Sequence, residues 1–237
     1  MGTTGETIAE ECNISRQDSD AYAARSQERA STAQANGWFD WETFAIEIPQ
    51  RRGEGVQFVI DEGIRADTTT DSLSRLRPVF RKDGQVTAGN ASTLNDGASA
   101  VLLADAEFAR NQGWGILGYV EDYCTTGVEP SRVMSAPISA VQMLLDRNNL
   151  NVLDVDVYEH NEAFASASCS VAQELKIPDD RFNLHGGAIS LGHPLGSSGT
   201  RCLITMLSVM RRVKGSTGVV TLCLGGGNAV AMLVRLA

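Results

Sequence analysis

The chain has 237 residues, of which 43% are hydrophobic and 21% are charged. This composition is typical of globular proteins and excludes a disordered chain, and the length corresponds to one or two domains. The 29 acidic side chains outnumber the 20 basic ones and give a formal net charge of −9. That charge argues against nonspecific binding of nucleic acid, which requires a basic face.

The sequence contains no signal for a membrane, a leader peptide or a metal site. Its apolar stretches are shorter than the roughly 20 residues of a membrane helix, and residues 1–12 are too polar for a signal peptide. The five cysteines show no C-x-x-C spacing, which argues against a zinc ribbon or a disulfide framework. We therefore expect reduced thiols, no metal, no membrane partner and a cytoplasmic location.

Residues 1–94 predict an irregular region. Ser15 and Asp18 match a capping box, which predicts a helix that runs to about Asn36 and stops at Gly37. The segments that follow are expected to be extended chain at 38–61, loop at 63–85 and a short helical turn at 71–76.

In residues 95–237, segments with strand and helix patterns alternate. Strands are predicted at 99–104, 115–123, 155–159, 219–224 and 229–236, and helices at 105–113, 137–150, 162–175 and 194–214. This order predicts an α/β domain with a βαβαβαββ mixed sheet between helices, mostly parallel. The three glycines that follow Leu224 predict a hairpin between the last two strands.

Three segments follow predicted strands or precede a helix, where α/β sheets bind ligands. They are His160-Asn-Glu162, the glycine-rich stretch 186–201 around His193, and Cys223-Leu-Gly-Gly-Gly227. Each side chain has two interpretations. His193 is a general base or a turn cap, and Cys223 is a proton-transferring thiol or a buried core residue. Asn161 is a helix N-cap or orients a water or carbonyl, and Glu162 is a first-turn acid or a positioning residue.

Together, an imidazole, a thiol, an amide and glycine N–H groups are suited to stabilising an enolate beside a thioester. The residues that carry these groups also resemble a known family. Asn161-Glu-Ala-Phe-Ala, Gly187-Ala-Ile-Ser-Leu-Gly-His-Pro and Cys223-Leu-Gly-Gly-Gly are similar to three C-terminal motifs of the thiolases, and Ala88–Gly97 is similar to that family's T-A-G-N-A-S-G-x-N-D-G segment. The resemblance implies a thiolase C-terminal half at 95–237, preceded at 1–94 by part of the loop domain that contributes to coenzyme A (CoA) binding.

The resemblance implies acyl transfer between acyl-CoA and CoA thioesters, by Claisen condensation or by 3-ketoacyl-CoA thiolysis. His193 would activate the nucleophile and line an oxyanion hole with a water held by Asn161. Cys223 would act as acid and base, and the N–H of Gly225 would form part of a second oxyanion hole. CoA thioesters would be the substrates, with no other cofactor.

The resemblance also implies CoA contacts from Ser92, Arg65 and Ser72. Phe164 would form a wall of the pantetheine tunnel, or would be a core aromatic residue. A run of arginines in residues 50–82, which includes Arg65, makes this segment the candidate for binding the nucleotide end of CoA.

The nucleophilic cysteine of the family has no counterpart in this sequence. Cys169 is the nearest imitation, but it falls within a predicted helix. We therefore expect a partner chain that carries the N-terminal thiolase half and its cysteine, in a heterodimer or heterotetramer. The alternatives are a non-catalytic subunit that binds CoA or acts as a scaffold, and a fragment of a full-length thiolase.

Overall fold

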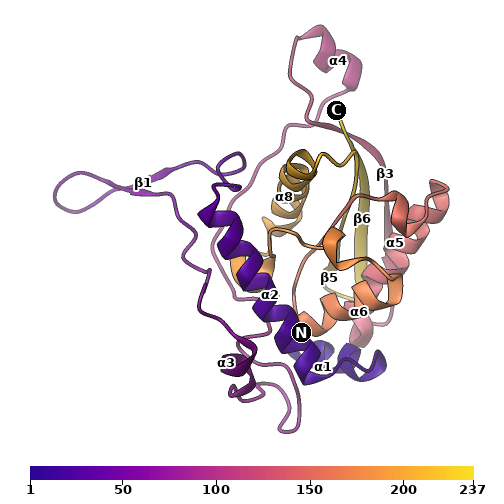
Figure 1. Cartoon of the computed structure of the whole chain (residues 1–237). Coiled ribbons are helices and arrows are strands. Elements are labelled where there is room, and N and C mark those ends of the chain that lie inside the picture. The colour runs from indigo at the N-terminus through magenta and orange to yellow at the C-terminus, as the bar shows by residue number, and fades with distance from the viewer.

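The computed structural model describes residues 1–237 and contains an α/β body from which two segments project (Figure 1). The helices are α1 (Gly2–Glu11), α2 (Arg16–Ala35), α3 (Thr70–Ser74), α4 (Ala106–Asn111), α5 (Ala136–Arg147), α6 (Ala165–Leu175), α7 (Ala188–Leu191) and α8 (Ser198–Val213). The strands are β1 (Ile46–Ile48), β2 (Val56–Phe58), β3 (Gly118–Gly127), β4 (Val157–His160), β5 (Thr217–Leu224) and β6 (Asn228–Leu236). Three short 3-10 turns lie at Pro130–Ser135, Val152–Asp154 and Asp179–Arg181.

The predicted capped helix is confirmed as α2. The Ser15 hydroxyl accepts a hydrogen bond from the Asp18 N–H, and the Asp18 carboxylate accepts one from the Ser15 N–H. Gly37 follows the helix with φ of +66°, a left-handed conformation that glycine adopts without strain. The helix α1 was not predicted, because its sequence lacks a clear apolar stripe and its N-cap residue, Met1, makes no side-chain capping bond.

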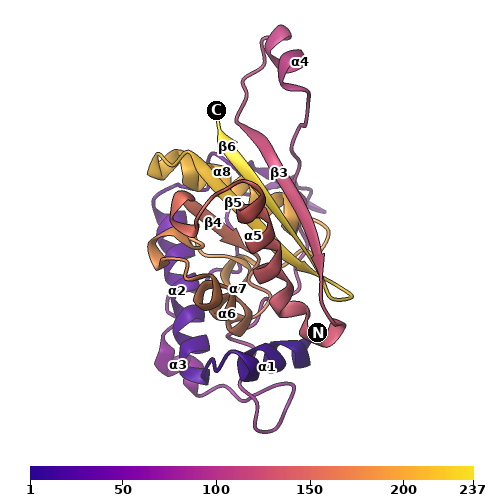
Figure 2. The same ribbon diagram turned by 90° about the vertical axis from the view of Figure 1, so that its right-hand side faces the viewer.

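The main sheet is mixed and has the strand order β3-β6-β5-β4. Only β4 and β5 are parallel, so the expectation of a mostly parallel sheet is wrong. The predicted hairpin is confirmed: β5 and β6 pair antiparallel, and Gly226 and Gly227 turn with φ of +85° and +94°. Figure 2 shows β3 and β6 side by side at the edge of this sheet.

Alternating side chains divide the core between the two faces of the sheet. Val219 packs with residues of α5 and α6 on one face, whereas Val220 packs with residues of α8 on the other. Figure 1 accordingly shows α5 and α8 on opposite sides of β6. The predicted sheet between helices is thus confirmed. None of the helices combines the length and the hydropathy that a membrane-spanning segment requires.

The strand predicted at 99–104 is absent. These residues pair with no strand of the sheet, and the side chains of Leu102 and Leu103 are 78% and 73% exposed. A strand requires a neighbour for its backbone N–H and C=O groups, and this chain supplies none here. The helix predicted after it is confirmed as α4, where the Asp105 side chain accepts the Phe108 N–H at 2.9 Å.

Candidate active site

Hydrogen bonds between main chains connect the segments that the sequence singled out. The bonds are Asn161 N–H to Thr221 O at 3.1 Å, Ser92 N–H to Ala163 O at 3.1 Å, and His193 N–H to Thr93 O at 2.9 Å. The loop between β4 and α6 therefore lies between the carboxyl end of β5 and the segment 91–95, which in turn contacts the His193 loop. Residues separated by 30 or more positions in sequence meet at one edge of the sheet, as expected for the carboxyl ends of parallel strands.

Asn161 is buried with an unused amide. The N-cap interpretation is wrong, because α6 begins at Ala165 with Phe164 at the cap position. The Asn161 side chain is 1% exposed, and neither its Oδ1 nor its Nδ2 has a hydrogen-bond partner in the protein. Buried polar groups are nearly always paired. An amide that no protein group satisfies is therefore available to a substrate or a water.

Glu162 is a positioning residue and not a first-turn acid of α6. It is fully buried, and its carboxylate accepts four hydrogen bonds. The donors are Tyr22 Oη at 2.8 Å, Ser26 Oγ at 2.7 Å, Asn183 Nδ2 at 3.0 Å and the Ile189 N–H at 3.2 Å. One side chain thus connects the Asn161 loop to α2 and to the start of α7, which leads into the His193 loop.

His193 is half-buried at the turn before α8. Its Nδ1 lies 2.6 Å from Ser198 Oγ, and Nε2 makes no hydrogen bond with the protein. Burial lowers the pKa of His193, and the nearby Arg201 guanidinium lowers it further. The imidazole is therefore neutral at pH 7, which is the form that a general base requires.

Cys223 lies near the end of β5, next to the glycine hairpin. The thiol is half-buried, and its Sγ lies 3.8 Å from the Met134 Sδ. Burial raises the pKa of Cys223 to about 11, so the thiol is protonated at neutral pH and can donate a proton. Gly225 is exposed, and a Cβ at this position would meet no atom within 4 Å, so its backbone is open to a ligand. All five cysteines are free thiols, and no three His, Cys, Asp or Glu side chains converge as metal ligands.

Two of the predicted CoA contacts have hydroxyls that already bond within the protein. Ser92 Oγ donates to the Ala163 carbonyl at 3.1 Å, beside the Asn161 loop. Ser72 belongs to the capping box of α3, whose N-cap is Thr69: the Ser72 N–H donates to the Thr69 hydroxyl at 3.1 Å, and the Ser72 hydroxyl donates to the Thr69 carbonyl at 2.8 Å. The Ser92 hydroxyl therefore lies next to the site, whereas the Ser72 hydroxyl has a structural role in its helix.

The other two predicted CoA contacts differ in exposure. Arg65 is exposed, and its N–H donates to the Gln27 side chain at 2.7 Å, which ties the segment to α2. Phe164 is 8% exposed; its ring lies against Gly5 of α1 and edge-on to Phe80, with 6.4 Å between ring centroids. These contacts favour the core interpretation of Phe164.

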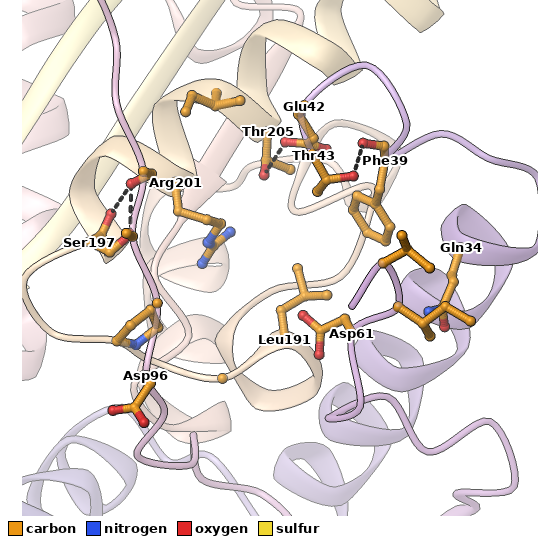
Figure 3. A pocket seen from close by; sticks show the side chains of 18 of the residues that line it. Gln34, Phe39, Glu42, Thr43, Asp61, Asp96, Leu191, Ser197, Arg201 and Thr205 are labelled. Carbon is orange, nitrogen blue, oxygen red and sulfur yellow. Dashed lines mark hydrogen bonds between the residues drawn. The ribbon is translucent and has the colours of Figure 1, made fainter. Parts of the chain in front are cut away.

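Sequence reasoning missed a cavity of about 650 Å³ beside α8 (Figure 3). Gly192 and Pro194, which flank His193, line it, and Arg201 extends toward its middle. Arg201 Nη1 bonds the fully buried Glu159 at 3.0 Å, but Nη2 has no protein partner. Glu42 accepts from the Thr205 hydroxyl at 2.8 Å through one oxygen, and its other oxygen is buried and unpartnered. The sequence signal for this cluster of Arg201, Glu159 and Glu42 was Arg201 itself, a charged residue within the helix that follows the glycine-rich stretch.

The Glu42 carboxyl should make stability depend on pH. Burial raises its pKa to about 7, against an ordinary value near 4.5, although the Thr205 hydroxyl and Arg201 act in the opposite direction. The folded chain then binds more protons than the unfolded chain between pH 4.5 and 7, so the free energy of unfolding falls as pH rises through this window. We expect Glu42→Gln to remove this fall, worth up to about 3 kcal/mol, in urea titrations at pH 5 and 8. An unchanged pH dependence in the variant would contradict the shift.

Models of two protein domains match the chain. The "Thiolase, C-terminal domain" model matches residues 114–236, and the "Thiolase, N-terminal domain" model matches residues 1–107. The expectation that the resemblance is confined to a C-terminal half is therefore wrong: the first 107 residues belong to the N-terminal domain of the family.

Curated relatives and solved structures agree with these matches. The chain is 45% identical over 234 residues to a "Probable acetyl-CoA acyltransferase" of Staphylococcus aureus and to one of Staphylococcus epidermidis. Each alignment covers 99% of this chain and 59% of the relative. An acetyl-CoA acetyltransferase of Bacillus anthracis superposes with a TM-score of 0.97 at 37% identity, and a human mitochondrial 3-ketoacyl-CoA thiolase with 0.96 at 37%. Both superpositions cover 100% of this chain and 60% or 59% of the other. The chain thus spans about 59% of the length of its relatives.

Proposed function

The chain belongs to the thiolase family, and we propose that it catalyses acyl transfer between an acyl-CoA, such as acetyl-CoA, and a second CoA thioester. The reaction is a Claisen condensation in one direction and 3-ketoacyl-CoA thiolysis in the other. The observation that supports this proposal is the series of main-chain hydrogen bonds that links the Asn161 loop to β5, two residues before Cys223, and through segment 91–95 to the His193 loop. The His193 Nε2 and the Asn161 amide are both free of protein partners there.

In the thiolysis direction, His193 takes the proton of an acyl-accepting cysteine thiol, and the resulting thiolate attacks the 3-keto carbonyl. The carbon–carbon bond breaks and leaves an enolate, to whose α-carbon Cys223 gives its proton. The Cys223 thiolate then takes the proton of free CoA. The CoA sulfur attacks the acyl-enzyme, and the departing cysteine thiolate recovers its proton from His193. A Cys223 thiol that is protonated at rest fits the first of its two steps.

Stabilisation of the oxyanions is assigned to groups that the fold leaves unpaired. Asn161, through a water, and the His193 imidazolium, whose Nε2 then carries the proton taken from the thiol, would bind one oxyanion, and the Gly225 N–H would bind the other. CoA would contact Ser92 and Arg65, with the arginines of 50–82 toward its phosphates. Ser72 would contribute to CoA binding indirectly, by stabilising α3. Phe164 would support the wall of the pantetheine tunnel as a packed core residue. The CoA thioesters are substrates, and the proposal requires no further cofactor.

We place the acyl-accepting cysteine on a partner chain that carries the rest of the N-terminal domain, in a cytoplasmic heterodimer or heterotetramer. Two features support a missing partner on the α8 side. Leu102 and Leu103 expose apolar side chains on a segment with strand composition and no neighbour. In the adjacent cavity, Arg201 and Glu42 each have a buried polar atom that lacks a partner. A surface of this kind is typical of an interface.

The test is purification of the tagged chain from its native source, with intact masses recorded with and without acetyl-CoA. We expect a second chain to co-elute and to gain an acetyl group, and the pair to cleave acetoacetyl-CoA, while the isolated chain does not. Activity of the pure single chain, or a native product longer than this sequence, would overturn the proposal of a partner chain. A complex that is neither acetylated nor active would overturn the acyl-transfer function itself.

Two leucine variants localise the interface. We expect Leu102→Asp to abolish co-elution while the stability of the isolated chain stays unchanged, since this side chain is 78% exposed. Leu153→Asp is the matched control, because Leu153 is 63% exposed in the 3-10 turn before β4. Equal loss of co-elution in both variants would contradict the assignment of the interface to residues 99–104.

A further inference from the structure

We propose that Ser198 fixes His193 in the tautomer that carries its proton on Nδ1, and so presents a bare Nε2 to the site. The assignment deepens the proposed function and depends on it for its catalytic meaning. Ser198 touches no reacting atom and acts through His193, so it is a positioning residue.

The hydrogen bonds of the Ser198 hydroxyl carry this assignment. Its Oγ lies 2.6 Å from His193 Nδ1 and 3.1 Å from the Pro194 carbonyl oxygen. A hydroxyl has one proton to donate, and a carbonyl oxygen can only accept. If Ser198 donates to Pro194 O, then Nδ1–H donates to Oγ and every contact is a hydrogen bond. If Ser198 instead donates to Nδ1, two oxygen lone pairs face each other at 3.1 Å.

Main-chain hydrogen bonds hold the Ser198 hydroxyl, the His193 ring and the Pro194 carbonyl in this arrangement. Ser198 is the first residue of α8 and is fully buried, and its own N–H also bonds Pro194 O, at 2.9 Å. The His193 N–H is anchored to the Thr93 carbonyl at 2.9 Å. The hydroxyl therefore has no other orientation that satisfies its neighbours. The hydrogen bond at one ring nitrogen of a histidine determines which nitrogen keeps the proton.

The consequence concerns the direction of proton transfer. With the proton on Nδ1, the lone pair of Nε2 is free to take the proton of a thiol, as the proposed mechanism requires. When His193 is doubly protonated, Ser198 continues to accept from Nδ1, so the ring does not turn during the cycle. A site without this hydroxyl would divide its histidine between two tautomers, of which only one is a base toward the site.

The test is a two-bond ¹H–¹⁵N correlation spectrum of the full chain, labelled at histidine, at a pH where His193 is neutral. Only three histidines are present, and His193→Gln identifies the signal. We expect Nδ1 at the shift of a protonated nitrogen and Nε2 at that of an unprotonated one. In Ser198→Ala we expect the two shifts to move toward each other. A wild-type spectrum with the proton on Nε2 would overturn the proposal, whether or not the variant folds.

A neighbouring serine supplies the control. Ser197→Ala removes a hydroxyl that bonds Ser99 at 2.7 Å, and we expect the His193 shifts to stay at their wild-type values. The signals of His160 and His185 report whether either variant keeps its fold. In an assembled enzyme, Ser198→Ala should lower kcat at least about tenfold with little change in KM. The spectrum is independent of activity, so an inactive complex would contradict the proposed function and leave the tautomer assignment standing.

Discussion

Replacing Glu162 with alanine is expected to lower the free energy of unfolding by at least about 4 kcal/mol, because four buried donors lose their acceptor at about 1–3 kcal/mol each. Those donors are Tyr22 Oη, Ser26 Oγ, Asn183 Nδ2 and the Ile189 N–H. These donors are buried, as is Glu162 itself, which is 0% exposed. The variant would thus loosen the contacts between α2, the Asn161 loop and the start of α7 together.

Urea unfolding followed by circular dichroism measures this effect. Glu174→Ala is the matched control on α6, where the side chain is exposed and should change stability by less than about 0.5 kcal/mol. If Glu162→Ala does not fold at all, Glu162→Gln keeps the shape but turns an NH₂ group toward donors, and should still cost more than about 1 kcal/mol. A loss below that value in both Glu162 variants would show that the carboxylate does not hold these elements together.

The features that sequence reasoning predicted correctly depend on residues that are close in the chain. The capping box at Ser15 and the glycine at 37 act within one turn of α2, and the glycines after Leu224 act within one hairpin. Each signal is a local backbone preference that tertiary packing did not oppose. The chain order of the polar segments then sufficed to place Asn161 and Cys223 on neighbouring strand ends.

The features that it missed depend on distant partners. The N-cap interpretation of Asn161 failed because the Asn90 carbonyl accepts the Ala165 N–H at 2.8 Å and fixes where α6 begins. Glu162 is explained by Tyr22, which is 140 positions away. The segment 99–104 has strand composition, but a strand also needs a neighbour, and composition does not reveal whether one exists. The ion pair between Arg201 and Glu159 joins α8 to β4, which are 42 positions apart at these residues, and has no local signature.

Replacing Asn161 with alanine is expected to separate activity from stability. In the assembled enzyme we expect kcat to fall about 10²- to 10³-fold, the effect of removing one oxyanion donor. In the isolated chain we expect the free energy of unfolding to stay within about 1 kcal/mol of wild type or to rise, because the change removes a buried amide that makes no protein hydrogen bond. Most substitutions of buried residues destabilise, so this direction is diagnostic.

Asn183→Ala is the control that gives the comparison its meaning. Asn183 is the same residue type and is also 1% exposed, but its amide donates to Tyr22, Glu162 and the His160 carbonyl and accepts the His160 N–H. Its removal should therefore cost several kcal/mol, about 1–3 for each buried group left unpaired. If Asn161→Ala destabilises the chain as much as Asn183→Ala does, the Asn161 amide has a structural partner and is not reserved for a ligand. If kcat is unchanged as well, the oxyanion role belongs to another residue.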